Sequence, residues 1–105
     1  MDFQVVWSPE AIEDMESIAG YISRDSERYA AAVVDRLLNA ARDLSYSPYA
    51  GRIVPELEDK SIRELIIYSY RLVYRVKGNV ITVAAVIHGK RLLDPVTERI
   101  RGQQQ

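Results

Sequence analysis

The amino-acid sequence predicts an α+β fold in which an N-terminal strand and a helical hairpin pack on one face of a mostly antiparallel sheet. Three observations lead to this fold class. A short strand pattern precedes two consecutive helical patterns, and three strand patterns then follow with no helix between them. The last of these strands, residues 80–87, is apolar on both faces, which is typical of a strand inside a covered sheet. The expected order is β-α-α-β-β-β.

Length and composition predict one domain over residues 1–101 and a flexible polar tail at residues 102–105. The chain has no cysteine and one histidine, so we expect no disulfide, no metal site and no cofactor. No apolar run has the length needed to cross a bilayer, and the N-terminus does not resemble a secretory leader. These features predict a cytoplasmic protein that does not bind membranes.

The net charge of −1 hides a division between the two halves of the chain. Residues 1–59 carry 5 basic and 12 acidic side chains, whereas residues 60–101 carry 9 basic and 3 acidic ones. Such an asymmetry favours an acidic or polyanionic partner for the second half.

The first strand is predicted at residues 3–7, where apolar side chains alternate. Ser8-Pro9-Glu10 then offers an N-cap, a proline at the first helical position and an early carboxylate. Apolar residues at three- and four-residue spacing predict the buried stripe of this helix: Ala11, Ile12, Met15, Ile18, Ala19 and Ile22. The acidic residues are predicted to lie on its solvated face: Glu10, Glu13, Asp14 and Glu16.

A second helix is predicted after a break at residues 23–26, with Asp25 or Ser26 as its cap and Pro48 as its end. The short break predicts that the two helices form an antiparallel hairpin. Residues 47–60 contain two prolines and a glycine and are predicted to form an ordered loop. The buried stripe of the second helix is predicted at Tyr29, Val33, Leu37, Ala41 and Leu44, widened by Ala30, Val34 and Leu38.

Strands are predicted at residues 62–68, 70–76 and 80–87, with a tight turn at Lys77-Gly78-Asn79. A short helix from Asp94 to Ile100 can follow the last strand. Strict alternation divides the last strand between two faces, with Val80, Ala84 and Val86 on one and Ile81, Val83, Ala85 and Ile87 on the other.

Two arginines fall on the same face of the strand at residues 70–76. Alternation places Arg71 and Arg75 with Val73, opposite the face that carries Tyr70 and Tyr74. Paired guanidinium groups indicate a surface that binds anions or carboxylates. Two arginines that merely solvate one face of the sheet are an equally good explanation.

Five segments in order along nearly the whole chain carry a family resemblance: Trp7-Ser8-Pro9-Glu10-Ala11, Gly51-Arg52-Ile53-Val54-Pro55-Glu56, Ile62-Arg63-Glu64-Leu65, Tyr70-Arg71-Leu72-Val73-Tyr74-Arg75-Val76 and Val86-Ile87-His88-Gly89-Lys90-Arg91. Together they resemble the RelE/ParE toxin superfamily of bacterial type II toxin–antitoxin modules. The resemblance implies a small toxin that is neutralised by a cognate antitoxin, whose C-terminal part wraps the toxin in hetero-oligomers.

The superfamily contains two kinds of toxin. ParE-like members poison DNA gyrase, whereas RelE-like members cut mRNA in the ribosomal A site. The resemblance to the nucleases places their arginines at Arg71 and Arg91, but their two lysines correspond to Ile62 and Glu64. The nucleases also use a tyrosine near the C-terminus, and this chain has none after Tyr74.

This departure favours a ParE-like toxin that inhibits DNA gyrase without catalysis. The alternative is a RelE-like, ribosome-dependent mRNA endoribonuclease, whose partners would be the ribosome and mRNA. A non-toxic basic adaptor is a third hypothesis, but it leaves the family resemblance unused.

His88 is a catalytic residue only under the ribonuclease alternative, where its imidazole would act as base or acid near Arg71. Otherwise it is a strand-end histidine bonded to the loop. Tyrosines on the strands can stack on bases, although cross-strand packing is the commoner role of such residues: Tyr68, Tyr70 and Tyr74. The residues predicted to bind the target or the antitoxin are Arg63, Arg71, Arg75, Lys90 and Arg91.

Overall fold

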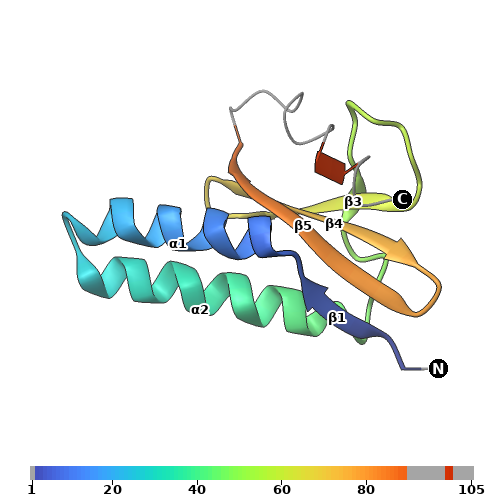
Figure 1. The fold of residues 1–105 in the computed structure, drawn as a ribbon, viewed down its shortest axis with the longest axis horizontal. Coiled ribbons are helices and arrows are strands. Elements are labelled where there is room, and N and C mark those ends of the chain that lie inside the picture. Colours follow the sequence, from blue (N-terminus) through green and yellow to red (C-terminus); the bar gives the residue numbers. More distant parts are fainter. Residues whose placement is uncertain (1, 90–98, 101–105) are drawn as a thin grey trace.

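The computed structural model describes residues 2–89 and 99–100 of the chain. In these residues, two helices lie side by side against one face of a five-stranded sheet (Figure 1). The predicted α+β class and strand–helix–helix–strand order are confirmed, and the segment predicted to be a loop contains a short additional strand, β2. The elements are β1 (Gln4–Trp7), α1 (Pro9–Ser23), α2 (Glu27–Asp43), β2 (Arg52–Ile53), β3 (Ile62–Ile67), β4 (Tyr70–Lys77) and β5 (Val80–His88).

The strands follow the order β1-β5-β4-β3-β2 across the sheet. β1 runs parallel to β5, and the pairs β5–β4, β4–β3 and β3–β2 are antiparallel. β5 therefore lies between β1 and β4, which confirms its predicted interior position. The hairpin between β4 and β5 turns at Gly78, whose φ of +61° is open to glycine without steric cost.

Serine side chains cap both helices. The Ser8 hydroxyl accepts a hydrogen bond from the Ala11 N–H at 3.1 Å, and the Ser26 hydroxyl accepts one from the Tyr29 N–H at 3.0 Å. The cap of α2 is thus Ser26 and not Asp25. The prediction that α2 extends to Pro48 is wrong, because the helix ends at Asp43 and tighter three-residue bonds continue through Tyr46.

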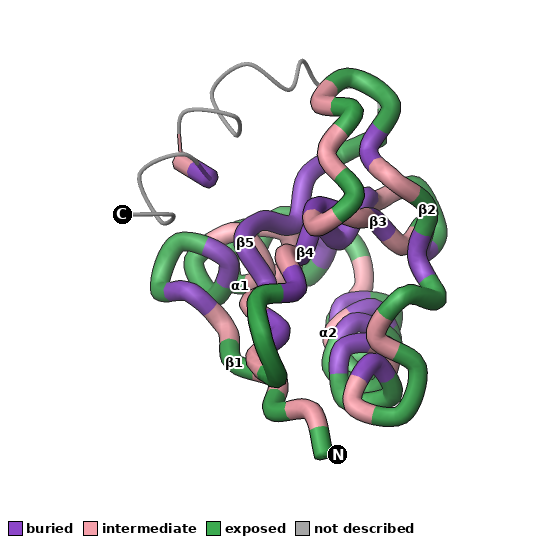
Figure 2. Tube along the Cα trace, turned by 90° about the vertical axis from the view of Figure 1, so that its right-hand side faces the viewer, coloured by how far each residue is buried: buried purple, intermediate pink, exposed green. Residues whose placement is uncertain are grey.

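Apolar side chains cover both faces of the sheet. The backbone of β4 and β5 is coloured as buried along most of its length (Figure 2). On the helix side, one cluster joins the helices to the sheet and includes Val33 and Leu37 of α2 and Leu72, Tyr74, Val83 and Val86 of the strands. A second cluster lies on the opposite face and includes Val54, Ile62, Val73, Ala85, Ile87 and Ile100. The doubly apolar pattern of β5 therefore has the two-sided cover that it predicted.

The predicted alternation along β5 is wrong because the strand contains a β-bulge. Tyr74 pairs with Val83 while Val73 pairs with Ala85, so Ala84 has no partner of its own on β4. A bulge inserts one residue and reverses the faces of those beyond it. Consequently Val86 joins the helix-side cluster, and Ala84 packs with Ala85 in the second one.

Asp14 does not lie on a solvated face of α1, contrary to the prediction. Its carboxylate accepts a hydrogen bond from the Val86 N–H at 3.0 Å and pairs with Arg99 at 2.8 Å. Arg99 also donates to the Ala84 carbonyl at 3.3 Å. One carboxylate thus joins α1 to the backbone just beyond the bulge and to the segment that carries Ile100.

The stripes predicted for the helices are wider than the surface that the sheet covers. Ile12, Tyr29 and Leu38 are exposed, because they lie at the margins of the packed faces. In the described part of the chain, no helix has the length and apolar character to span a membrane. Most of the helix predicted from Asp94 lies outside the described residues, as does the tail at 102–105, but Arg99 and Ile100 are helical.

Gly51 lies where a side chain has no room. A Cβ atom there would come within 2.6 Å of the Glu64 carbonyl oxygen and 2.8 Å of the Tyr74 hydroxyl. We expect Gly51→Ala to lower the free energy of unfolding by about 1–3 kcal/mol, since backbone or core must shift. Gly20→Ala in α1 is the matched control, because its Cβ would meet no atom within 4 Å. Alanine favours the helix over glycine, so this change should raise the free energy of unfolding by about 1 kcal/mol. Urea denaturation measures both, and equal effects would contradict the close packing at Gly51.

Candidate functional site

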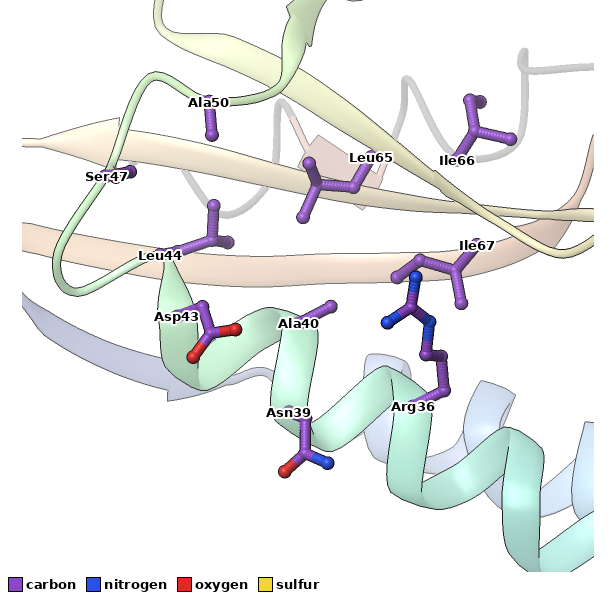
Figure 3. A pocket seen from close by; sticks show the side chains of 10 residues that line it. All are labelled: Arg36, Asn39, Ala40, Asp43, Leu44, Ser47, Ala50, Leu65, Ile66 and Ile67. Atoms are coloured by element: carbon purple, nitrogen blue, oxygen red, sulfur yellow. The ribbon is translucent and has the colours of Figure 1, made fainter.

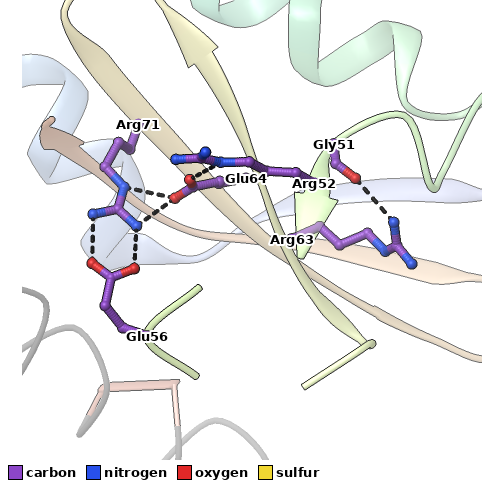
Figure 4. Close-up of polar contacts among 6 residues, drawn as sticks. All are labelled: Gly51, Arg52, Glu56, Arg63, Glu64 and Arg71. Atoms are coloured by element: carbon purple, nitrogen blue, oxygen red, sulfur yellow. Dashed lines mark hydrogen bonds and ion pairs between the residues drawn. The ribbon is translucent and has the colours of Figure 1, made fainter. Parts of the chain in front are cut away.

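Four charged side chains form a cluster on the face of the sheet that is opposite the helices (Figure 4). Arg71 on β4 donates two parallel hydrogen bonds to the Glu56 carboxylate, both at 2.9 Å. The Arg71 Nε and Nη2 atoms both lie 2.6 Å from Glu64 Oε1 on β3. The other Glu64 oxygen accepts a hydrogen bond from Arg52 on β2 at 2.6 Å. Every oxygen of both carboxylates is therefore engaged by a guanidinium group.

Burial divides the charge cluster into an inner pair and an outer pair. The Glu64 side chain is 0% exposed and the Arg71 side chain 7%, whereas Glu56 is 46% exposed and Arg52 62%. Two cations and two anions sum to no net charge. The interpretation of Arg71 as a surface group that only solvates the sheet is therefore wrong, and the carboxylates it binds in this structure belong to its own chain.

The ion pairs change the titration of the outer carboxylate. Its hydrogen bonds to Arg71 hold the pKa of Glu56 below its ordinary value of 4.5. The same bonds raise the pKa of Arg71, against the opposing effect of burial. Because the folded pKa of Glu56 lies below the unfolded one, its stabilisation is complete above about pH 4.5 and is lost as the pH falls through the folded value.

Arg63 lies apart from the charge cluster, although it also belongs to β3. Alternation along β3 turns Arg63 to the face opposite that of Glu64. Its guanidinium donates to the Gly51 carbonyl at 3.0 Å and stacks on the Tyr49 ring, 4.8 Å from the centroid. The structure therefore places Arg63 and Arg71 on two different surfaces.

The other predicted basic residues are only partly located. Arg75 is half-buried on β4, between Ile62 and Thr82 of the neighbouring strands. Hydrogen bonds from Ser61 lower the pKa of Asp59, and the positive charge of Arg75 contributes to that shift. Lys90 and Arg91 lie outside the described residues.

His88 and Arg71 do not meet. His88 is paired with Tyr70 at the end of β5, where the two rings pack edge to face at 5.9 Å, whereas Arg71 is paired with Ile87. Adjacent pairs in an antiparallel ladder point to opposite faces. His88 and Arg71 therefore lie on opposite faces of the sheet, whereas the ribonuclease alternative expects the imidazole beside Arg71.

The tyrosines predicted on the strands make contacts within the protein, although Tyr68 lies in the turn after β3. Tyr74 is fully buried and its hydroxyl accepts a hydrogen bond from the Gly51 N–H at 2.9 Å. Burial raises the pKa of Tyr74. Tyr68 is 53% exposed and packs edge to face with Tyr29 at 6.1 Å. These contacts match the packing role given to the tyrosines rather than a row of base-stacking rings.

Ion pairs within the chain neutralise part of the opposite charges of the two halves. Arg71 of the basic half binds Glu56 of the acidic half, and Arg99 binds Asp14. Among the described residues, no group of three or more histidine, cysteine or acidic side chains is placed to hold a metal ion.

Glu56, Glu64 and Arg52 were missed as site residues, although part of the signal was in the sequence. The two-residue turn at Tyr68-Ser69 pairs Ile66 with Arg71, which places Glu64 diagonally across from Arg71 on the same face. A carboxylate at an inward strand position beside an arginine is the signature of a buried ion pair. No such local pattern in the sequence predicted the ion pair between Glu56 and Arg71.

Comparisons with known proteins agree on the RelE/ParE toxin superfamily. Residues 5–93 match the family described as the ParE toxin of the type II toxin–antitoxin system parDE. Toxin RelE2 of Caulobacter vibrioides is 32% identical over 90 residues, which cover 85% of this chain and 98% of that protein.

Solved structures share the fold at lower identity. The ParDE system of P. aeruginosa has a chain that is 20% identical with a TM-score of 0.67, covering 82% of this chain and 95% of that one. A double mutant of the E. coli toxin RelE in the free state is 17% identical with a TM-score of 0.68, covering all of both chains. The chain therefore belongs to the ParE toxin family of type II toxin–antitoxin systems, within the RelE/ParE superfamily.

Proposed function

We propose that this toxin stops growth by binding DNA gyrase, without cutting RNA, and that a cognate antitoxin neutralises it. The family match over residues 5–93 supports the toxin–antitoxin assignment and names the ParE toxin of parDE. The choice between the two activities of the superfamily rests on the chemistry of the charge cluster.

The observation that carries the proposal is that Arg71, although charged, is fully paired inside a charge cluster with no net charge. When the 2′-hydroxyl of RNA attacks the adjacent phosphate, negative charge builds up on the phosphate oxygens. A nuclease must stabilise this charge with cationic side chains that are not already paired. Here the buried carboxylate of Glu64 lies 2.6 Å from the Arg71 guanidinium, and Glu56 occupies its outer edge. A phosphate at this position would be repelled by two carboxylates, and both arginines of the charge cluster are already paired with those carboxylates.

The acid–base requirement points the same way. A nuclease needs a proton acceptor and a proton donor at the scissile phosphate. Glu64 takes the position at which the resemblance to RelE-type nucleases expects a lysine, and His88 faces away from Arg71. Binding to a protein target requires neither group.

The ribonuclease alternative has one observation in its favour, which is the 32% identity to a toxin named RelE2. Under that alternative Arg71, Arg91 and His88 would serve the cleavage, and Glu56 would have to leave Arg71 first. The two hypotheses make opposite predictions in cells.

Induction of the toxin without its antitoxin tests the proposal directly. With purified components, we expect the toxin to inhibit the supercoiling of relaxed plasmid by gyrase. In the induced cells, we expect primer extension on mRNA to show no codon-linked cuts. His88→Ala should leave growth inhibition largely intact, because no proton transfer depends on that ring. Arg91→Ala should reduce toxicity more than His88→Ala, since it removes a positive charge.

General acid–base groups contribute about 10²–10⁴-fold to a rate, so a catalytic His88 would be conspicuous in this test. The comparison requires that thermal melting of His88→Ala match that of the unaltered protein. A stably folded His88→Ala protein that neither inhibits growth nor cuts mRNA, next to an unaltered toxin that does both, would reject the gyrase proposal in favour of the ribonuclease.

A further inference from the structure

A groove of about 380 Å³ lies between α2 and the end of β3 that β2 does not cover (Figure 3). The apolar part of its lining comes from Ala40 on α2, from Leu44 just after the helix, and from Leu65 and Ile67 on β3. Arg36 and Asp43 lie at opposite ends of the stretch of α2 that borders the groove (Figure 3). The groove is separate from the charge cluster, which occupies the other face of the sheet.

Beyond Glu64, the outer edge of β3 borders this groove and carries no strand from the described residues. The Val54 N–H donates to the Ile62 carbonyl from the outer side, so alternation directs the backbone groups of Ile66 to that side as well. β2 pairs with Arg63 and Glu64 only, and in the described part of the chain no strand pairs with Ile66 on its outer side. The Ile66 side chain is 57% exposed. A strand edge with unpaired backbone groups is a template for another strand.

Two charged side chains of α2 beside this edge are complementary to the same two side chains of a second copy. Arg36 and Asp43 are seven residues apart, about two helical turns, and so lie on the same side of α2. Neither side chain forms an ion pair or a side-chain hydrogen bond with another described residue. A copy of α2 that runs antiparallel to the first would place each arginine opposite the aspartate of its partner.

The geometry points to self-association of this chain through the open β3 edge. In the proposed dimer a two-fold axis passes near Ile66, so that Ile66 pairs with its own copy and Leu65 with Ile67 of the second chain. The shared edge continues the sheet, the two grooves face one another, and Arg36 of each copy meets Asp43 of the other. Such an interface is isologous and closes after two copies.

The paired segment is short, because β2 covers β3 up to Glu64 and the strand ends at Ile67. We therefore expect a dimer that dissociates on dilution. This association is independent of the target of the toxin, so its failure and that of the gyrase proposal are distinguishable.

Charge reversal provides a specific test by sedimentation velocity over a dilution series of the full chain. Arg36→Glu places two acidic side chains at each contact, and Asp43→Arg places two basic ones there. We expect each variant alone to be monomeric at concentrations where the unaltered chain is dimeric. An equimolar mixture of the two variants restores both opposite-charge contacts and should dimerise, as should the double variant. Circular dichroism melting of each variant verifies that these exposed changes on α2 leave the fold intact.

Three results would overturn the proposal: a monomeric unaltered chain at the highest soluble concentration, single variants that dimerise like the unaltered chain, or a mixture that stays monomeric. Hydrogen exchange at Ile66 gives a second readout, since its amide should become protected as the dimer forms. Protection that appears only when the antitoxin is added, with a monomeric free toxin, would assign this edge to the antitoxin and reject self-association.

Discussion

Val83→Asp is expected to unfold the protein. Val83 is fully buried in β5, where it pairs with Trp7 on one side and Tyr74 on the other, and its carbonyl accepts a hydrogen bond from the Ser8 N–H at 3.0 Å. An aspartate there would bury a charge among the apolar side chains that join the helices to the sheet. An uncompensated buried charge costs several kcal/mol. Proteins of this size have a total free energy of unfolding of about 5–15 kcal/mol, so the loss is comparable with the whole.

The matched control lies one residue away on the same strand. Thr82 points to the other face, is only half-buried, and pairs with Arg75 across β4, so Thr82→Asp places a carboxylate near a cation. Far-UV circular dichroism and thermal melting should show a cooperative transition for Thr82→Asp and none for Val83→Asp. A soluble Val83→Asp protein that melts cooperatively near the unaltered temperature would show that β5 is not the interior strand of this sheet.

Arg71→Met is expected to be the most destabilising change in the charge cluster. It leaves the fully buried Glu64 carboxylate with only Arg52, whose side chain is 62% exposed. Removal of one partner of a buried ion pair typically costs about 3–5 kcal/mol, since the other charge stays buried without compensation. The free energy of unfolding in urea at neutral pH measures this loss.

A second substitution separates the cost of an unpaired charge from the loss of packing. Glu64→Met in the Arg71→Met background removes the stranded carboxylate, and a buried ion pair replaced by apolar groups is often close to neutral in stability. We therefore expect the double variant to be more stable than Arg71→Met alone. Losses that simply add in the double variant would mean that the two side chains do not act as a pair.

The sequence determined the helices and strands, and also those of their ends that depend on contacts between neighbouring residues. Ser8 before Pro9 and Ser26 before the second apolar stripe both became N-caps, because a serine hydroxyl satisfies a free N–H one turn away. Gly78 turned the last hairpin, and the doubly apolar β5 took an interior place in the sheet. Five short segments in a fixed order along the chain were also enough to indicate the superfamily, which the family match confirms.

The tertiary structure alone decided which residues share a face and which charges meet. The bulge at Ala84 reversed the second half of β5, and no local pattern signals a bulge within a continuous apolar run. Asp14 had the spacing of a solvated residue, yet the N–H that it binds belongs to Val86, 72 residues away. Alternation gave the face of Arg71 correctly, but its role depends on Glu56 and Glu64, which come from a loop and a neighbouring strand.

The physical reason is the range of the interactions. Caps, turns and periodicity act within one or two turns of the chain, so the residues that specify them are adjacent in the sequence. The energy of a buried charge depends on the partners that folding brings to it from distant segments. The sequence by itself therefore determined the fold and the family of this toxin. The pairing of Arg71 with two carboxylates, and the position of Ile66 at an edge that no described strand covers, were decided only by how the strands and the loop pack together.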